Sequence, residues 1–195
     1  MKSGLHLLAF DFGASSGRAM LGRFDGNRLE IDEIHRFSNE PVDCCGHFYW
    51  DTLRLFWEIK RGLSIYVSSR QGQLQGIGID TWGVDFGLLG PSGELIGTPY
   101  HYRDRRTENV LEKAFKRMPK EEIFKHSGIA FQKFNSLYQL LALKETNPVI
   151  LDNASHLLFM PDLFAYFLTG EIATEYTEAT TSQLLNAYSR TWSRE

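Results

Sequence analysis

The chain has 195 residues, of which 43% are hydrophobic and 23% are charged, with a formal net charge of −3. This composition is typical of a globular domain with a substantial core, and the acidic balance argues against a nucleic-acid or membrane-surface partner. No apolar run approaches the roughly 18 residues of a membrane span. The first residues lead directly into a strand pattern without signal-peptide features, which predicts a reducing, cytoplasmic setting.

The first predicted elements are two strands joined by a turn of small and polar residues. Residues 5–10 form an apolar run that predicts a buried strand ending at the carboxylate of Asp11, and residues 19–24 form a second apolar run. The segment between them is a hairpin tip with an unusual number of polar groups. It contains Ala14, Ser15, Ser16, Gly17 and Arg18.

The residue types in this tip suit the binding of an anion. Glycines and serines allow backbone amides to converge on an anion, and the planar arginine side chain fits phosphate oxygens. Asp11 would repel a phosphate unless a cation such as Mg²⁺ lay between them. An ordinary glycine-rich hairpin explains the same residues equally well, because short motifs of this kind recur without function.

The next segments predict a third strand, a loop and a helix. Residues 29–37 alternate between apolar and polar side chains, which indicates an antiparallel strand. We expect residues 38–50 to form a loop, in which the adjacent Cys44 and Cys45 lack the spacing of a metal site and serve no structural purpose. Asp51 is a good N-cap for a helix that extends to about residue 69.

A further strand is expected at residues 74–80, and it also ends in a carboxylate, Asp80. Another apolar run follows at residues 86–89 and should pair with residues 94–97 as a hairpin. The segment between the two runs contains Trp82, Gly83 and Asp85. It leaves the sheet on the side where open α/β sheets bind ligands. Packing of Trp82 in the core and turn capping by Asp85 are the plainer explanation.

Residues 101–107 are dense in charge and include Arg103 and Asp104, which suits either a solvated loop or the polar wall of a sugar site. The remainder of the chain reads as short helices. We expect them at residues 107–117, 119–127, 137–144 with Asn135 as the cap, after Pro148, and at 160–169 with a stop at Gly170.

Several motifs in order resemble the FGGY carbohydrate kinases, which belong to the actin-like ATPase superfamily. The motifs are Asp11-Phe-Gly-Ala-Ser-Ser-Gly-Arg18, Gly78-Ile-Asp-Thr-Trp-Gly-Val-Asp-Phe86 and Tyr102-Arg-Asp-Arg-Arg-Thr107, with weaker matches at 134–140, 160–170 and 179–183. The resemblance implies an α/β fold with a ribonuclease H-like core, a mixed sheet and inserted helices. It also implies that residues 1–195 are the N-terminal lobe and that the C-terminal lobe is absent.

The resemblance also implies a reaction and roles for individual residues. The family transfers the γ-phosphoryl group of ATP to a sugar hydroxyl, and the motifs are most similar to the members that phosphorylate the ketose L-rhamnulose at its 1-hydroxyl. By this resemblance the ATP phosphates contact residues 14–18, Asp11 positions Mg²⁺, and Gly83 lies against the sugar. The other candidates on the sugar side are Trp82, Asp85, Arg103 and Asp104.

In the family the catalytic aspartate lies downstream of the matched region, and the second lobe supplies the adenine pocket. We therefore assign no catalytic residue within 1–195 and expect the chain alone to be inactive, with the missing lobe and a small sugar as its partners. Two alternatives remain at this stage. A ribonuclease H-like nuclease would use Asp11 and Asp80 as metal ligands, although the chain lacks a basic stripe for nucleic acid. A non-catalytic actin-like scaffold is the other.

Overall fold

The computed structural model describes residues 4–69 and 72–194. The chain divides into two compact units. Unit 1 consists of Met1–Glu40 and Asp51–Trp82, and unit 2 consists of Pro41–Trp50 and Gly83–Glu195. The boundary between Trp82 and Gly83 therefore falls within the segment that the sequence analysis assigned to a sugar site.

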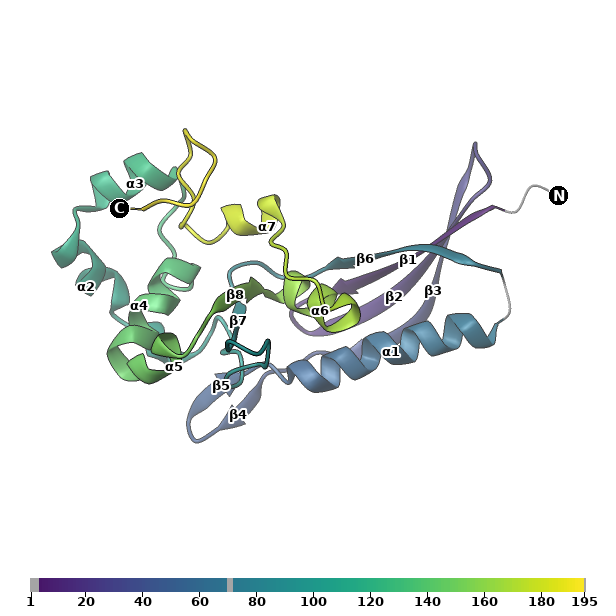
Figure 1. Ribbon diagram of the computed structural model, residues 1–195, viewed down its shortest axis with the longest axis horizontal. Helices are drawn as coiled ribbons and strands as arrows, with labels where there is room; N and C mark the ends of the chain where they lie inside the picture. The colour runs from purple at the N-terminus through teal and green to yellow at the C-terminus, as the bar shows by residue number, and fades with distance from the viewer. Residues whose placement is uncertain (1–3, 70–71, 195) are drawn as a thin grey trace. The chain divides into compact units, whose positions relative to one another are not determined.

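Unit 1 is a four-stranded sheet with one long helix on one of its faces (Figure 1). The strand order is β3-β2-β1-β6, in which β1, β2 and β3 are antiparallel and β6 runs parallel to β1. The elements are β1 (Leu5–Phe12), β2 (Ser16–Phe24), β3 (Leu29–Ser38), α1 (Thr52–Ser68) and β6 (Leu74–Asp80). This mixed sheet with its covering helix agrees with the predicted ribonuclease H-like core.

The core of unit 1 lies between the sheet and α1, where Phe10 and Ala19 are fully buried. Gly62 allows this close approach, because a Cβ atom there would lie 2.7 Å from the Phe10 ring and 3.1 Å from the Ala19 Cβ. Asp51 caps α1 as predicted and accepts a hydrogen bond from the Arg54 amide at 3.1 Å. Alternation along β1 sends its odd-numbered residues to the other face, where Leu7 is 40% exposed.

Unit 2 combines two small antiparallel sheets with short helices (Figure 1). Its strands are β4 (Val42–Cys44) paired with β5 (His47–Tyr49), and β7 (Phe86–Leu89) paired with β8 (His156–Phe159). Its helices are η1 (Arg105–Thr107), α2 (Val110–Arg117), α3 (Lys120–Ser127), α4 (Ser136–Thr146), α5 (Pro148–Asp152), α6 (Met160–Thr169) and α7 (Tyr176–Thr180). Phe159 is fully buried in a cluster that also contains Phe86, Leu88 and Leu143.

One prediction about strands in unit 2 was wrong, and another was confirmed only in part. Residues 38–50 are not only a loop, because β4 and β5 form a hairpin whose two turn residues, Cys45 and Gly46, have φ values of 53° and 76°. The predicted pairing of 86–89 with 94–97 is present as one bridge, Leu89 to Leu95, and a hydrogen bond of 2.7 Å from the Ile96 amide to the Leu88 carbonyl. The longer pairing of this strand is with β8, which was not predicted. Runs of three or four residues carry too little periodicity to identify a strand or its partner.

The helices follow the sequence prediction with local differences. Asn109 adopts a φ of 60°, and this left-handed residue separates η1 from α2 where one continuous helix was expected. Asn135 occupies the N-cap position of α4 but does not cap it, because its side-chain amide donates to Ala130 and Gln183 instead. Within the described residues, no helix is both long and apolar enough to cross a membrane.

Candidate functional site

The tip between β1 and β2 is held in shape through its carbonyl groups. The Gly13 amide donates to the Ser16 carbonyl at 2.9 Å. The buried Asn39 donates from its amide to the Ser15 carbonyl at 3.0 Å and from its side chain to the Gly13 carbonyl at 2.7 Å. In the described part of the chain, the amides of the exposed Ala14 and Ser15 have no recorded acceptor. Asn39 therefore fixes the tip through its carbonyl groups, and the amides of Ala14 and Ser15 remain available to a ligand from solvent.

Gly17 has a packing role that the sequence analysis did not foresee. A Cβ atom at this position would lie 2.2 Å from the Phe37 ring, on the neighbouring strand β3. Phe37 is buried and contacts the Phe12 ring edge-on. The glycine is therefore required by the core of unit 1, whatever the tip binds.

Charged side chains form a row across the four strands beside this tip. Arg18 on β2 is the register partner of Asp11 on β1, and the two form an ion pair with each side chain roughly two-fifths exposed. Asp80 on β6 is the register partner of Asp11 on its other side, and Arg36 on β3 is the partner of Arg18. Arg36 in turn donates to Glu33 at 2.9 Å and lowers the pKa of that carboxyl group.

This row contains groups that fit a magnesium ion. Mg²⁺ in phosphate sites is usually held by one or two carboxylates, with phosphate oxygens and water completing its shell. Asp11 and Asp80 end neighbouring parallel strands, about 4.8 Å apart in a sheet, and both are accessible to solvent. Residues 4–69 and 72–194 contain no group of three or more His, Cys, Asp or Glu side chains placed to hold a metal alone. The carboxylates therefore suit an ion that arrives with a phosphate.

The segment Gly83-Val84-Asp85 forms a strained turn in unit 2. The Asp85 amide donates to the Gly83 carbonyl at 2.9 Å around Val84, whose φ is 70°. This is a γ-turn of the rare type with positive φ, which is costly for a β-branched residue. Such strain persists only where surrounding contacts determine the backbone.

Three side chains supply those contacts. The Ser136 hydroxyl donates to the Val84 carbonyl at 2.6 Å, and the Gln139 side chain donates to the same carbonyl at 3.3 Å. The Val84 amide donates to the Thr181 hydroxyl at 3.1 Å. A Cβ atom on the half-buried Gly83 would lie 3.1 Å from the Thr181 side chain. The turn is thus fixed by α4 and by the segment after α7.

Asp85 is enclosed within unit 2 with no exposed surface. Its carboxylate accepts hydrogen bonds from Trp50 Nε1 at 2.6 Å, Gln139 Nε2 at 2.7 Å and the Tyr102 amide at 3.0 Å. Burial raises the pKa of Asp85 to about 7, although these bonds and the nearby Arg106 oppose the shift. Asp85 joins the turn to three other segments and leaves no face open to a ligand.

Asp104 is likewise buried, with 2% of its surface exposed. It accepts hydrogen bonds from the Phe48 amide at 2.8 Å and the Arg106 amide at 2.9 Å, and His47 Nδ1 lies 3.1 Å away. Arg103, in contrast, is exposed, and its guanidinium group lies 5.2 Å from the centre of the half-buried Tyr102 ring. Of the sugar-side candidates in this loop, only Arg103 reaches solvent.

An aromatic stack lies beneath this loop. The His101 ring contacts both Trp50 and Tyr102, with ring centres 4.0 Å and 4.4 Å apart. Burial, followed by the charge of Arg103, lowers the pKa of His101 to about 4. Trp82, the last residue of unit 1, is half-buried. Its placement on the sugar side remains a prediction.

Sequence reasoning missed the residues that support the turn and the loop. They are Trp50, Ser136, Gln139 and Thr181. Ser136 and Gln139 are buried polar residues on the first turns of α4. Polar residues at the start of an otherwise apolar helix are the sequence feature that could have indicated them.

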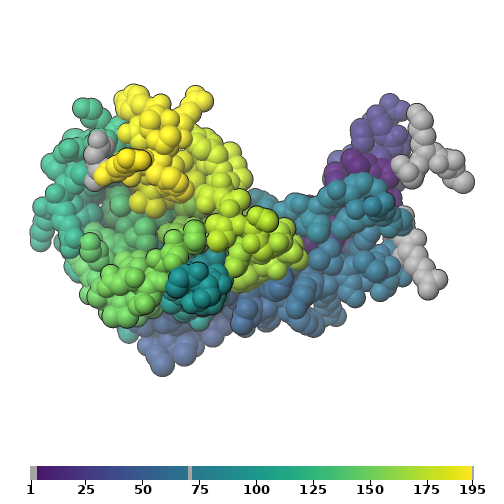
Figure 2. Space-filling view, in the orientation of Figure 1, coloured from purple at the N-terminus to yellow at the C-terminus, as the bar shows by residue number. Residues whose placement is uncertain are grey.

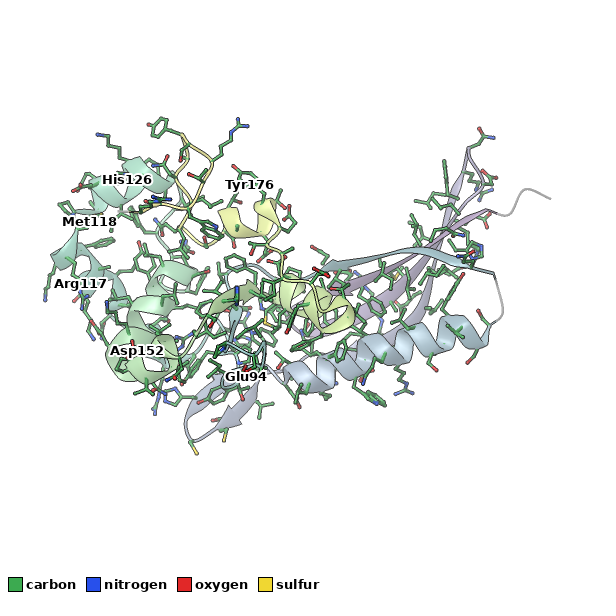
Figure 3. All side chains as sticks on the ribbon, in the orientation of Figure 1. Glu94, Arg117, Met118, His126, Asp152 and Tyr176 are labelled. Carbon is green, nitrogen blue, oxygen red and sulfur yellow. The ribbon has the colours of Figure 1, made fainter. Side chains whose placement is uncertain are left out.

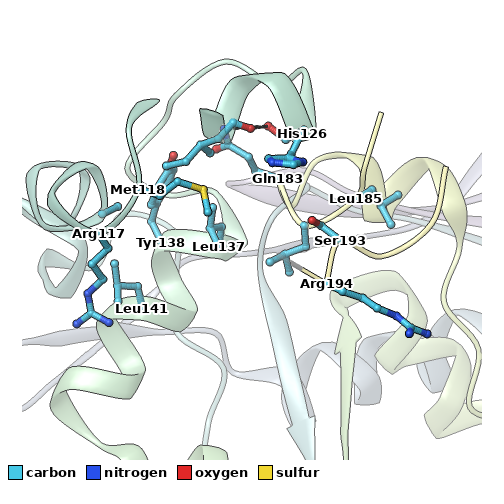
Figure 4. A pocket seen from close by; sticks show the side chains of 14 residues that line it. Arg117, Met118, His126, Leu137, Tyr138, Leu141, Gln183, Leu185, Ser193 and Arg194 are labelled. Carbon is cyan, nitrogen blue, oxygen red and sulfur yellow. Dashed lines mark hydrogen bonds between the residues drawn. The ribbon is translucent and has the colours of Figure 1, made fainter. Parts of the chain in front are cut away.

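Unit 2 also contains a cavity of about 470 Å³ between α2, α3, α4 and residues 183–194 (Figure 4). Its walls are mainly apolar and include Leu137, Leu141 and Met118, while Arg117 and Arg194 contribute charge. The described residues that line it include none of the predicted phosphate or sugar residues.

Comparison with known proteins gives consistent matches over nearly the whole chain. Residues 6–195 match the N-terminal domain of the FGGY family of carbohydrate kinases. Rhamnulokinase from Oceanobacillus iheyensis is 42% identical over 185 residues, which are 95% of this chain and 39% of that protein. Rhamnulokinase from Bacteroides thetaiotaomicron is 45% identical over 185 residues, which are 95% of this chain and 38% of that protein.

The fold is also that of a solved sugar kinase. Gluconate kinase from Lactobacillus acidophilus superposes with a TM-score of 0.86 and 18% identity, covering 98% of this chain and 39% of that chain. The chain thus spans about two fifths of the length of the proteins it matches.

Proposed function

The chain belongs to the FGGY family of carbohydrate kinases, and from this premise we propose that it is the N-terminal part of an ATP-dependent kinase that phosphorylates L-rhamnulose at its 1-hydroxyl. The similarity to curated rhamnulokinases supports the choice of sugar. The observation that carries the proposal is the fixed tip with the exposed residues 13–15 and the Asp11–Arg18 pair beside it. Family membership gives no support to the nuclease or the scaffold alternative.

We assign the phosphate contacts to the tip. The amides of Ala14 and Ser15 and the hydroxyl groups of Ser15 and Ser16 donate to phosphate oxygens. Arg18 exchanges its Asp11 partner for the phosphate, because a guanidinium group binds phosphate oxygens through two parallel hydrogen bonds. Gly17 takes part through its backbone, and its missing side chain leaves room for Phe37.

Asp11 holds Mg²⁺ in this proposal, with Asp80 as its neighbour in the row. The ion, when bound, neutralises charge on the transferred phosphoryl group. The exchange at Arg18 releases the Asp11 carboxylate for this role. Without nucleotide, Asp11 and Arg18 neutralise each other at the end of the sheet.

The sugar contacts belong to unit 2 and the adjoining Trp82. Gly83 permits close approach of the sugar to the backbone, and the exposed Arg103 offers donors to its hydroxyl groups. Because Asp85 and Asp104 are buried, we assign them a positioning role: Asp85 fixes the 83–85 turn, and Asp104 fixes the loop that carries Arg103.

We assign no catalytic base within residues 1–195, and we propose that the complete kinase contains a C-terminal lobe that supplies the base and the adenine pocket. Phosphoryl transfer depends mainly on positioning and charge neutralisation. We therefore expect this chain to bind its ligands weakly and to show no sugar-dependent ADP release in a coupled assay. Turnover near one per second, with contaminating kinases removed, would contradict this assignment.

Hydrogen–deuterium exchange on the purified chain tests the two binding assignments separately. Millimolar Mg-ATP should slow exchange at residues 14–18, whereas Mg²⁺ with adenosine should not, because adenosine lacks phosphates. L-Rhamnulose should slow exchange at 83–85 and 102–104. The proposal fails if Mg-ATP protects other segments and leaves residues 14–18 unchanged.

A further inference from the structure

The two cysteines of the chain lie together at the end of the β4–β5 hairpin. Cys44 and Cys45 are the only cysteines in the sequence, and both thiols are free and exposed. Their Sγ atoms are 3.9 Å apart. The hairpin is the blue projection at the lower edge of Figure 2, and Figure 3 shows sulfur atoms at its tip. No role in the proposed kinase reaction uses this pair.

The hairpin holds the thiols on a well-anchored base. Cys44 pairs with His47 across the last rung, so Cys45 and Gly46 form a two-residue turn in which both φ angles are positive. This turn type favours Asn-Gly or Gly-Gly, and a cysteine at its first position is an unusual choice. At the base, Phe48 accepts from the His101 amide and donates to Asp104.

The sulfur separation suits one atom bound to both thiols better than it suits a disulfide. A disulfide needs an S–S distance of about 2.05 Å, so the sulfurs would have to close by nearly half their separation of 3.9 Å. A thiophilic atom with sulfur bonds of about 2.3 Å, as in zinc–thiolate sites, would bridge 3.9 Å with an S–X–S angle of about 116°. A tetrahedral or pyramidal centre prefers a smaller angle, so the sulfurs must approach each other, but by much less than a disulfide requires.

The number of ligands that a thiophilic partner needs distinguishes zinc from an arsenical at this pair. Structural zinc takes four ligands, and the described residues offer no third His, Cys, Asp or Glu to complete a metal group with the two thiols. A monosubstituted trivalent arsenical needs only two thiols, because its third bond is to carbon. The pKa of Cys44 is raised by hydrogen bonding to Cys45, which favours the thiol form of Cys44 that this chemistry consumes.

We propose that Cys44 and Cys45 form a capture site for soft electrophiles that bind two thiols at once, such as trivalent organic arsenicals. In the reaction, R–As=O condenses with two S–H groups to form two As–S bonds. The arsenic–oxygen bond breaks, and both thiol protons leave with the oxygen as one molecule of water. Arsenic stays trivalent, so the step needs no oxidant or reductant. This site is independent of the proposed kinase function.

Intact-protein mass spectrometry with phenylarsine oxide tests the proposal. We expect one arsenical per chain, with loss of one water, resistant to excess 2-mercaptoethanol and reversed by dithiothreitol. Two-point attachment should make the adduct at least about 10²-fold more resistant to the monothiol than a one-point adduct. Cys44→Ser and Cys45→Ser should each abolish that resistance. Both positions are exposed, and circular dichroism confirms that each variant is folded.

Two results would overturn the inference. One is displacement of the wild-type adduct by 2-mercaptoethanol at the same concentration as in the single variants. The other is a monothiol-resistant adduct that survives in either serine variant. Because neither readout involves ATP or a sugar, the outcome is separate from that of the kinase proposal.

Discussion

Arg18 and Asp11 lie directly opposite each other on β2 and β1 and form an ion pair at the end of the sheet where the exposed tip begins. The pair is flanked by Arg36 on one side and Asp80 on the other. The row therefore has two cations on β3 and β2 and two carboxylates on β1 and β6, and the charge changes sign between Arg18 and Asp11. A phosphate that approaches this row is attracted by Arg18 and repelled by Asp11. It must therefore replace Asp11 as the partner of Arg18 or bind together with a cation that neutralises Asp11.

Replacement of Arg18 by alanine should weaken Mg-ATP binding. A charge-assisted hydrogen bond contributes about 1.5–3 kcal/mol, so the dissociation constant should rise about ten- to a hundredfold. Isothermal titration calorimetry measures this change. Arg23→Ala is the matched control, because Arg23 lies on the same strand and forms an exposed ion pair with Asp32. Equal losses in both variants would point to net charge and not to the tip.

Asp11→Asn should reduce the dependence of ATP binding on Mg²⁺. The substitution removes a hard anionic ligand and also removes a charge that repels phosphate. Magnesium-free ATP should therefore bind at least as tightly as to the parent chain, while the gain on adding Mg²⁺ shrinks. Titrations with and without Mg²⁺ measure both effects, with Asp32→Asn as the control. An unchanged gain from Mg²⁺ would exclude Asp11 as a ligand.

The sheet of unit 1 was predictable from sequence because each strand leaves a local signal. The apolar run of β1, the alternation in β3 and the Asp51 cap of α1 each fix an element by short-range chemistry. The β4–β5 hairpin and β8 were missed for the opposite reason. They are three or four residues long, and the partner of β8 lies about 70 residues away at Phe86–Leu89. Pairing over that separation leaves no local pattern.

The candidate site was predicted as a set of residues but not as a set of contacts. The motifs drew attention to Asp85 and Asp104 as polar groups beside a sugar, and the structure shows both buried. Asp85 is held by Trp50 and Gln139, which come from distant segments of the chain. A sequence motif proposes a set of residues, whereas only the three-dimensional structure can separate a residue exposed to a ligand from one that is buried and supports the site.

Gly62→Ala should destabilise unit 1 although alanine is the better helix former by about 1 kcal/mol. The added Cβ would lie 2.7 Å from the Phe10 ring, and overpacking typically costs about 1–3 kcal/mol. Urea unfolding followed by circular dichroism should show a lower free energy of unfolding. Gly78→Ala is the control, because nothing described lies within 4 Å of a Cβ there. A more stable Gly62→Ala chain would mean that α1 lies further from the sheet.

Ser136→Ala should loosen the strained turn at Val84. The Ser136 hydroxyl is fully buried and donates to the Val84 carbonyl at 2.6 Å. Its loss should lower the free energy of unfolding by about 1 kcal/mol and speed amide exchange at residues 83–85. Ser92→Ala, at an exposed turn, is the control and should change neither. Unchanged exchange at 83–85 would show that Gln139 and Thr181 hold the turn without Ser136.

Asp85→Asn should change the pH dependence of stability. The folded pKa of about 7 lies above the unfolded value of about 3.9, so the folded chain binds the extra proton between these values. The free energy of unfolding therefore falls by up to about 4 kcal/mol as the pH rises from about 4 to about 7. Above pH 7 it no longer depends on the titration of Asp85. Below this window, protonated Asp85 carries no buried charge.

Asp85→Asn lacks this titration. Comparison of the variant with the parent chain therefore separates the effect of Asp85 from the effects of His101 and Asp162, whose pKa values are shifted to about 4 and about 6. In Asp85→Asn, the NH₂ group replaces one carboxylate oxygen and faces a donor in either orientation: Gln139 Nε2 on one side, or Trp50 Nε1 and the Tyr102 amide on the other. We expect the variant to be less stable than the parent at pH 5, with a gap that narrows at pH 8. Urea titrations at both pH values measure the gap. An equal gap at pH 5 and pH 8 would mean that Asp85 is ionised at both pH values and stabilised by its three donors.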